Sequence, residues 1–147
     1  MKSVREILEQ GGYSCVICSG EKTYASGDRG IKPLLRWIRE GINVRGGAAA
    51  DLIVGKAAAL LYVKLGISSL YAAVLSEQGE KILQEHGIVY TYGEKVPYII
   101  NRAGNGMCPM EQTVREISDP EDAVGALEAK LSELAGGHSS STCLSEK

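Results

Sequence analysis

The chain has 147 residues, a hydrophobic fraction of 44%, no Phe and a formal net charge of −2. This length suits a single domain with a core, which we place at residues 1–135, and the Ser- and Gly-rich segment 136–147 is expected to be a disordered tail. The weak negative charge argues against binding to nucleic acid. We see no export signal and no apolar run long enough for a membrane span, so the four cysteines indicate reduced thiols in the cytoplasm.

Apolar periodicity and turn residues divide the domain into alternating helices and strands. The first half of the chain is expected to contain a helix over 2–10, a hairpin with strands at 13–18 and 23–25, a helix around 34–38 and a helix over 48–65. A strand over 70–75, a helix over 78–85 and a strand over 88–92 follow. After a turn at 93–95 we expect an extended edge segment over 96–100, then helices over 108–117 and from 120. The helix over 48–65 is apolar nearly all round, which is typical of a buried helix. This order predicts an α/β fold of three α/β/α layers with a mixed sheet.

In folds of this class, ligands bind at the carboxyl edge of the strands, next to helix N-termini. Two glycine-containing segments are candidates for such helix starts: 45–47 and 104–109. We therefore expect Arg45, Gly47, Asn101 and Arg102 to contact a ligand, with the two arginines binding an anionic group. The alternative for both arginines is a solvated position in a loop.

The segment Cys108-Pro109-Met110-Glu111 predicts a helix start that carries a thiol. Proline is favoured at the first helical position, which makes Cys108 the N-cap residue. A thiolate there would meet unpaired N–H groups and the positive end of the helix dipole, as reactive cysteines often do. We predict Cys108 as a nucleophile or binding thiol, with a structural cap as the alternative. Glu111 either assists the thiol or caps the first turn.

Asp51 and Lys56 interrupt the apolar run over 48–65. A buried charge is costly unless it is paired. On one helix, residues five apart point about 140° away from each other, so these two would not pair directly. We predict Asp51 as a catalytic residue near the ligand edge and Lys56 as a substrate-binding residue. The alternative for Lys56 is a side chain that reaches the surface.

Several other patterns favour structure over chemistry. Gly55-Lys56 is not a phosphate-binding loop, because positions 50 and 57 are both Ala where that motif needs Gly and Ser or Thr. The Cys15-x-x-Cys18 pair lies in a predicted strand, where its thiols point to opposite faces, so we expect core packing and not a redox or zinc site. His86 could serve Cys108 as a base, but a surface position at a helix end is the commoner case. No metal and no cofactor is expected.

Three runs, 55–59, 96–102 and 108–111, resemble a small uncharacterised prokaryotic family, domain of unknown function 1893, and the resemblance covers about Tyr13 to Leu134. That family is similar to the cytidine deaminases in fold but not in active-site residues. Deaminases need His-x-Glu or Cys-x-Glu at one helix start and Pro-Cys-x-x-Cys at the next. Neither 48–51 nor the segment from 76 has these residues, and 108–111 inverts the Pro-Cys order. The resemblance therefore implies a cytidine-deaminase-like fold without the zinc motif.

These observations favour a metal-free pocket that binds or converts a small polar or anionic metabolite, with nucleotide-like molecules among the candidates. The residues expected to line it are Asp51, Lys56, Arg102, Cys108 and Glu111. The alternatives are a non-catalytic protein-interaction module of the same fold and a redox-responsive protein that uses Cys108. We expect no nucleic-acid or membrane partner. A homodimer is a further expectation, because twofold assemblies are common.

Overall fold

A five-stranded mixed sheet forms the centre of the molecule. The computed structural model describes residues 3–28, 30–100 and 108–136, with side chains up to residue 133. The strands are β1 (Cys15–Ser19), β2 (Lys22–Ser26), β3 (Ala48–Val54), β4 (Ser69–Ser76) and β5 (Val89–Val96). They lie in the order β2-β1-β3-β4-β5, with β3, β4 and β5 parallel and β1 antiparallel to both of its neighbours.

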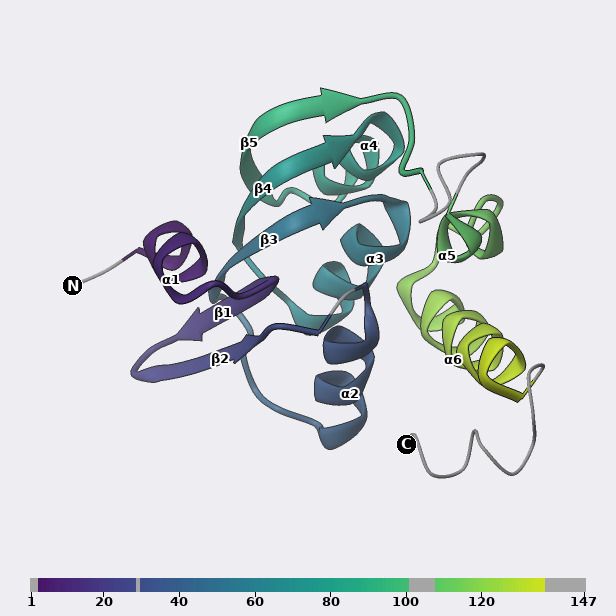
Figure 1. The fold of residues 1–147 in the computed structure, drawn as a ribbon, viewed down its shortest axis with the longest axis horizontal. Coiled ribbons are helices and arrows are strands. Elements are labelled where there is room, and N and C mark those ends of the chain that lie inside the picture. The colour runs from purple at the N-terminus through teal and green to yellow at the C-terminus, as the bar shows by residue number, and fades with distance from the viewer. Residues whose placement is uncertain (1–2, 29, 101–107, 137–147) are drawn as a thin grey trace.

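Helices cover the two faces of this sheet unequally. They are α1 (Val4–Gly11), α2 (Lys32–Glu40), α3 (Lys56–Leu65), α4 (Glu77–Glu85), α5 (Pro109–Thr113) and α6 (Pro120–Gly136). Figure 1 shows α1 alone on one face, α2, α3 and α4 on the other, and α5 and α6 outside α3. The predicted three-layer α/β/α fold is thus confirmed. None of the described helices is long and apolar enough to cross a membrane.

The unequal covering follows from the connections between the parallel strands. The chain runs β3-α3-β4-α4-β5 in one direction across the sheet. Because such crossovers share one handedness, α3 and α4 must lie on the same face. The main core is therefore on that face, around fully buried side chains such as Ile17, Leu60 and Leu83. A small second cluster of Leu8, Val16 and Ala50 holds α1 on the other face.

Local signals placed most element ends correctly. Helix α1 begins at a capping box, in which the Ser3 side chain accepts from the Glu6 amide and the Glu6 side chain accepts from the Ser3 amide. It ends where Gly12 takes the left-handed conformation, and α2 ends at Gly41 in the same way. The predicted hairpin is also confirmed, with β1 and β2 paired from Cys15–Ser26 to Ser19–Lys22.

The prediction of one helix over 48–65 is wrong. Residues 48–54 form the central strand β3, and α3 begins only after Gly55. A central strand of a sheet covered on both faces carries apolar residues on both sides, so it lacks the alternation that marks a half-exposed strand. In the sequence, the apolar residues of this strand therefore run on into those of the apolar helix that follows, with no visible boundary. The segment 45–47 consequently precedes a strand and does not begin a helix.

Two further boundaries differ from prediction. No turn interrupts 93–95, because β5 continues through Gly93 to Val96 and pairs with β4 over its length. The tyrosine-rich start and the charged end of this strand are one exposed edge strand. The Cys108 helix is also shorter than predicted, since α5 ends at Thr113 and not near Ile117.

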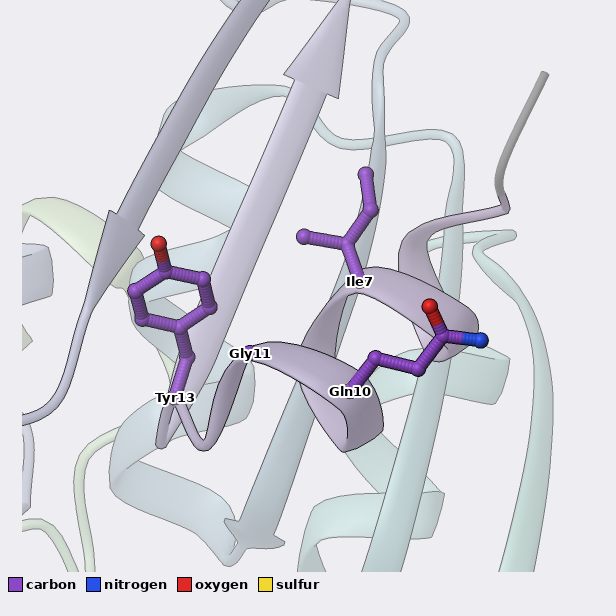
Figure 2. Close-up of a pocket in the computed structure, with 4 residues that line it drawn as sticks. All are labelled: Ile7, Gln10, Gly11 and Tyr13. Atoms are coloured by element: carbon purple, nitrogen blue, oxygen red, sulfur yellow. The ribbon is translucent and has the colours of Figure 1, made fainter.

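We predict that α1 depends on Leu8, whose side chain is 1% exposed. Replacing Leu8 by Ala should lower the free energy of unfolding by roughly 2–5 kcal/mol, the usual cost of a cavity at a buried Leu. Urea denaturation measures this. Ile7→Ala is the control, because Ile7 is half-buried and lines an open hollow of about 250 Å³ with Gln10, Gly11 and Tyr13 (Figure 2). Equal losses in the two variants would contradict this account of how α1 is held.

Candidate functional site

Three charged side chains are buried in the described part of the chain, and all three are residues that the sequence singled out. Asp51, Lys56 and Glu111 are each 8% exposed. They come from β3, α3 and α5 respectively. Because burial of a charge is costly, each must have a local arrangement that compensates it.

Lys56 and Glu111 meet where β3 and β4 end and two helices begin. Gly55 follows β3 and precedes α3, and Ser76 ends β4 and caps α4 by accepting from the Gly79 amide at 2.9 Å. A Cβ on Gly79 would lie 3.0 Å from the carbonyl group of Gly55, so the two helix starts are in close contact. This is the carboxyl edge of the parallel strands, the position at which ligands bind in folds of this class.

The carboxylate of Glu111 caps α3. Its two oxygens accept hydrogen bonds from the backbone amides of Lys56 (2.8 Å) and Ala57 (2.9 Å). The prediction that Glu111 caps the first turn of its own helix is therefore wrong. Burial raises the pKa of this carboxyl group, while the two amides and the charge of Lys56 oppose that rise. The N-terminus of α3 thus holds an anion that the chain itself supplies.

Gly55 is required by this contact. A Cβ at position 55 would lie closer than 3.0 Å to all three carboxyl atoms of Glu111. The φ of Gly55 is −105°, so the requirement is space and not an unusual backbone conformation.

The other polar groups at this edge come from α5 and the segment after it. The Nζ of Lys56 donates to the carbonyl oxygen of Arg115 at 3.0 Å. Cys108 is the N-cap residue of α5, as predicted, and its amide donates to the carbonyl of Ile99 at 2.9 Å. Its side chain is half-buried and makes no capping hydrogen bond. Cys108 thus lies three residues before Glu111, at the start of the same short helix.

Asp51 belongs to a different group of contacts. It lies in β3 and not in the first turns of a helix, so the argument from helical spacing to Lys56 does not apply. Its carboxylate accepts from the hydroxyl of Tyr62 at 2.7 Å and from the amide of Ile53 at 3.1 Å. Burial raises its pKa to about 7 against these hydrogen bonds. Cys15 faces Asp51 across the β1–β3 pair, and burial together with Asp51 raises the pKa of its thiol to about 12.

The remaining candidates do not join either group in the described part of the chain. Arg45 is exposed and Gly47 is packed under the Cys18 carbonyl, both at the amino end of β3, opposite the ligand edge. Asn101 and Arg102, with the glycine-rich loop, lie outside the described residues, as does Cys143. His86 is an exposed C-cap of α4.

Sequence reasoning missed two partners. Tyr62 is completely buried, and its hydroxyl donates to the carboxylate of Asp51. In the sequence, a tyrosine within an otherwise apolar helix could have indicated that its hydroxyl needs a buried partner. The Arg115 carbonyl, which holds Lys56, is a backbone group and leaves no signal in the sequence.

A hollow of about 190 Å³ lies between Val4 of α1 and the amino ends of β4 and β5, away from the Lys56–Glu111 edge. In the described residues no group of three or more His, Cys, Asp or Glu could hold a metal ion.

Comparison with known proteins places the chain in a family. The family model for DUF1893 (TM1506), a domain of unknown function, matches residues 3–131. The chain belongs to the DUF1893 family. A crystal structure of a DUF1893 family protein (TM1506) from Thermotoga maritima has 32% sequence identity and a TM-score of 0.79, over 86% of each chain. No curated protein matches the chain. The closer likeness to cytidine deaminases remains a prediction.

We predict that Gly55→Ala destabilises the protein by displacing Glu111 from the N-terminus of α3. The expected loss is on the order of 1–3 kcal/mol, the cost of unmaking buried hydrogen bonds to a charged group. Gly125→Ala is the matched control, because a Cβ there meets no atom within 4 Å in the interior of α6. That change should raise stability slightly, since Ala is the better helix former. If Gly55→Ala left the free energy of unfolding unchanged in urea denaturation, the proposed role of Gly55 in making room for Glu111 would be contradicted.

We predict that Asp51 makes stability fall as the pH rises. Its pKa is about 7 in the folded protein and 3.8 for an unperturbed Asp, so the folded state binds more protons between these limits. Stability is then fully present below about pH 4 and declines until about pH 7, by about 1.4 kcal/mol for each pKa unit of difference. Asp51→Asn should flatten this decline of the free energy of unfolding with pH. Asp122→Asn, a change at an exposed residue, should leave the decline unchanged. A slope unchanged by Asp51→Asn in pH-dependent denaturation would contradict the prediction.

Proposed function

We propose that the edge formed by Lys56, Glu111 and Cys108 binds a small polar or anionic metabolite, with Cys108 as a nucleophile or binding thiol. A nucleotide-like molecule is one such ligand. The observation that carries the proposal is the burial of both Lys56 and Glu111 at the junction of β3 and α3, where the Glu111 carboxylate accepts from the backbone amide of Lys56. Asp51, which the sequence also predicted as a catalytic residue, is left out of this proposed site, because the hydrogen bonds of its carboxylate are to Tyr62 and Ile53.

The chemistry of the three side chains suits such a ligand. Lys56 supplies a cation with three donors, of which one is directed at the Arg115 carbonyl. Glu111 supplies a carboxylate with a raised pKa, oriented by two amides. Cys108 is half-buried at the start of α5, the same short helix that carries Glu111. Binding and thiol reactivity are therefore the properties to test.

A second candidate, the protein-interaction module, is favoured by the sheet face that α1 leaves uncovered. Figure 1 shows no helix beside β4 and β5 on the α1 side. Val89 at the start of β5 is 69% exposed, and Leu52 of β3, two residues after the Ala50 that packs against α1, is 43% exposed. Exposed apolar side chains on an open sheet are typical of a surface that binds another protein.

The test is alkylation of the native protein with iodoacetamide at pH 7, followed by peptide mapping and native mass spectrometry. We expect Cys108 to react before Cys15, because burial raises the pKa of the Cys15 thiol and shields it until unfolding, and faster than the half-buried Cys18. Lys56→Gln should slow the alkylation of Cys108, because it removes a positive charge from the same edge of the sheet. Lys95→Gln is the control, because it removes a lysine of β5 whose ammonium group pairs with Glu80 of α4.

Two outcomes would decide against the metabolite site. Cys108 could react no faster in the native protein than in an unfolded peptide, with no effect of Lys56→Gln. The purified protein could also carry no small ligand and shift no resonance near Lys56 with a panel of anionic metabolites. Together these results would favour the protein-interaction module.

A further inference from the structure

Strand β5 forms one edge of the sheet along its whole length. It pairs with β4 from Val89 to Val96, and Figure 1 shows no described helix or strand on its outer side. The backbone N–H and C=O groups on the outer side of an edge strand can pair with a strand of another chain. The opposite edge, β2, has five residues against eight in β5, so β5 offers the longer free edge.

The charged side chains of β5 do not block this edge. Lysines on edge strands commonly prevent pairing with another chain. Here the ammonium of Lys95 is directed back onto its own chain, since it donates to Glu80 of α4 at 3.0 Å and lies 5.7 Å from the centre of the Tyr92 ring. The other oxygen of Glu80 accepts from the hydroxyl of Tyr90 at 2.7 Å. Tyr90 and Lys95 therefore lie together on the α4 side of the sheet.

The sequence of β5 is complementary to itself when two copies of the strand run antiparallel. Around a twofold axis, a residue that faces a second residue of the partner strand is matched by that second residue facing the first. With the axis between positions 92 and 93, every residue of β5 has a partner: Val89 faces Val96, Tyr90 faces Lys95, Thr91 faces Glu94, and Tyr92 faces Gly93. No two like charges of the strand then face each other.

This register also agrees with the side-chain contacts within one chain. Facing residues of an antiparallel pair lie on the same side of the sheet, with their Cβ atoms about 4.5–5.5 Å apart. Tyr90 and Lys95 meet this condition, because both contact Glu80 on the α4 side. Lys95 would then lie beside the partner's Tyr90 and Glu80. Positive and negative charges would alternate across the twofold axis, so each Glu80 carboxylate would lie near two ammonium groups.

We propose that two copies of this chain associate through β5, edge to edge and antiparallel, to form one continuous sheet. The partner is a second copy because the facing pairs and the Glu80–Lys95 charges are complementary under a twofold axis. This inference does not depend on whether the Lys56–Glu111 edge binds a ligand.

The first test is analytical ultracentrifugation of the full chain over a range of concentrations. We expect a mass that rises from one chain to two. Lys95→Glu should raise the dissociation constant about tenfold, because it places like charges beside each other twice in the symmetric pair. Lys64→Glu is the matched control, since Lys64 also pairs with a glutamate, Glu121 of α6, away from β5. Adding Glu80→Lys to Lys95→Glu restores opposite charges and should restore the dimer, and circular dichroism checks that each variant is folded.

The second test is a disulfide that depends on the register. Chains with Thr91→Cys mixed with chains with Glu94→Cys should form a linked dimer on oxidation, because facing residues lie within reach of a disulfide. Either variant alone, or mixed with the wild-type chain, should give no such product, since positions 91 and 94 are roughly 10 Å apart along the strand.

Two results would overturn the inference. One is a chain that stays monomeric at every concentration. The other is a dimer that Lys95→Glu does not weaken and that the mixed cysteine variants do not link, because such a dimer would use another surface.

Discussion

The contact between the Glu111 carboxylate and the start of α3 ties the outer helical segment to the sheet. It spans 55 residues of sequence and satisfies two amides that would otherwise be buried without acceptors. Helix α3 cannot cap itself, because its N-cap residue is Gly55 and has no side chain. Gly55 in turn cannot be larger, because the carboxylate fills the space beside it. The glycine at position 55, the lack of a side-chain cap there and the carboxylate supplied by Glu111 therefore depend on one another.

The two buried carboxylates differ because their surroundings differ. Glu111 receives two helix amides and lies near the cation of Lys56. Among the described residues no cation lowers the pKa of Asp51, which relies on a hydroxyl and on strand amides. Burial therefore raises the pKa of Asp51 to about 7, whereas the rise at Glu111 is opposed by a charge. One carboxylate caps a helix beside a cation, and the other is held by a hydroxyl and strand amides alone.

The sequence predicted the class of fold and the chemically important residue types better than it predicted their positions. Caps and turns are local, so the ends of α1 and α2 at Gly12 and Gly41 were correct. The β3–α3 boundary was missed because a doubly covered strand and a buried helix both appear as unbroken apolar runs. Gly55 was the residue that marked this boundary. The role of Glu111 was missed because capping was expected within its own helix, whereas tertiary packing supplied a different helix.

Lys56 is the charged residue that the architecture explains least. Glu111 caps α3, and Asp51 accepts hydrogen bonds from the Tyr62 hydroxyl and the Ile53 amide. The ammonium of Lys56 makes a hydrogen bond to one backbone carbonyl, that of Arg115. Burial of an ammonium group is costly, and one backbone carbonyl compensates only part of that cost, so stability alone does not favour a lysine here. Its position, at the carboxyl edge of the parallel strands and beside the helix that carries Cys108, is where a ligand would use a cation. Lys56, more than either acid, therefore favours a binding site at this edge.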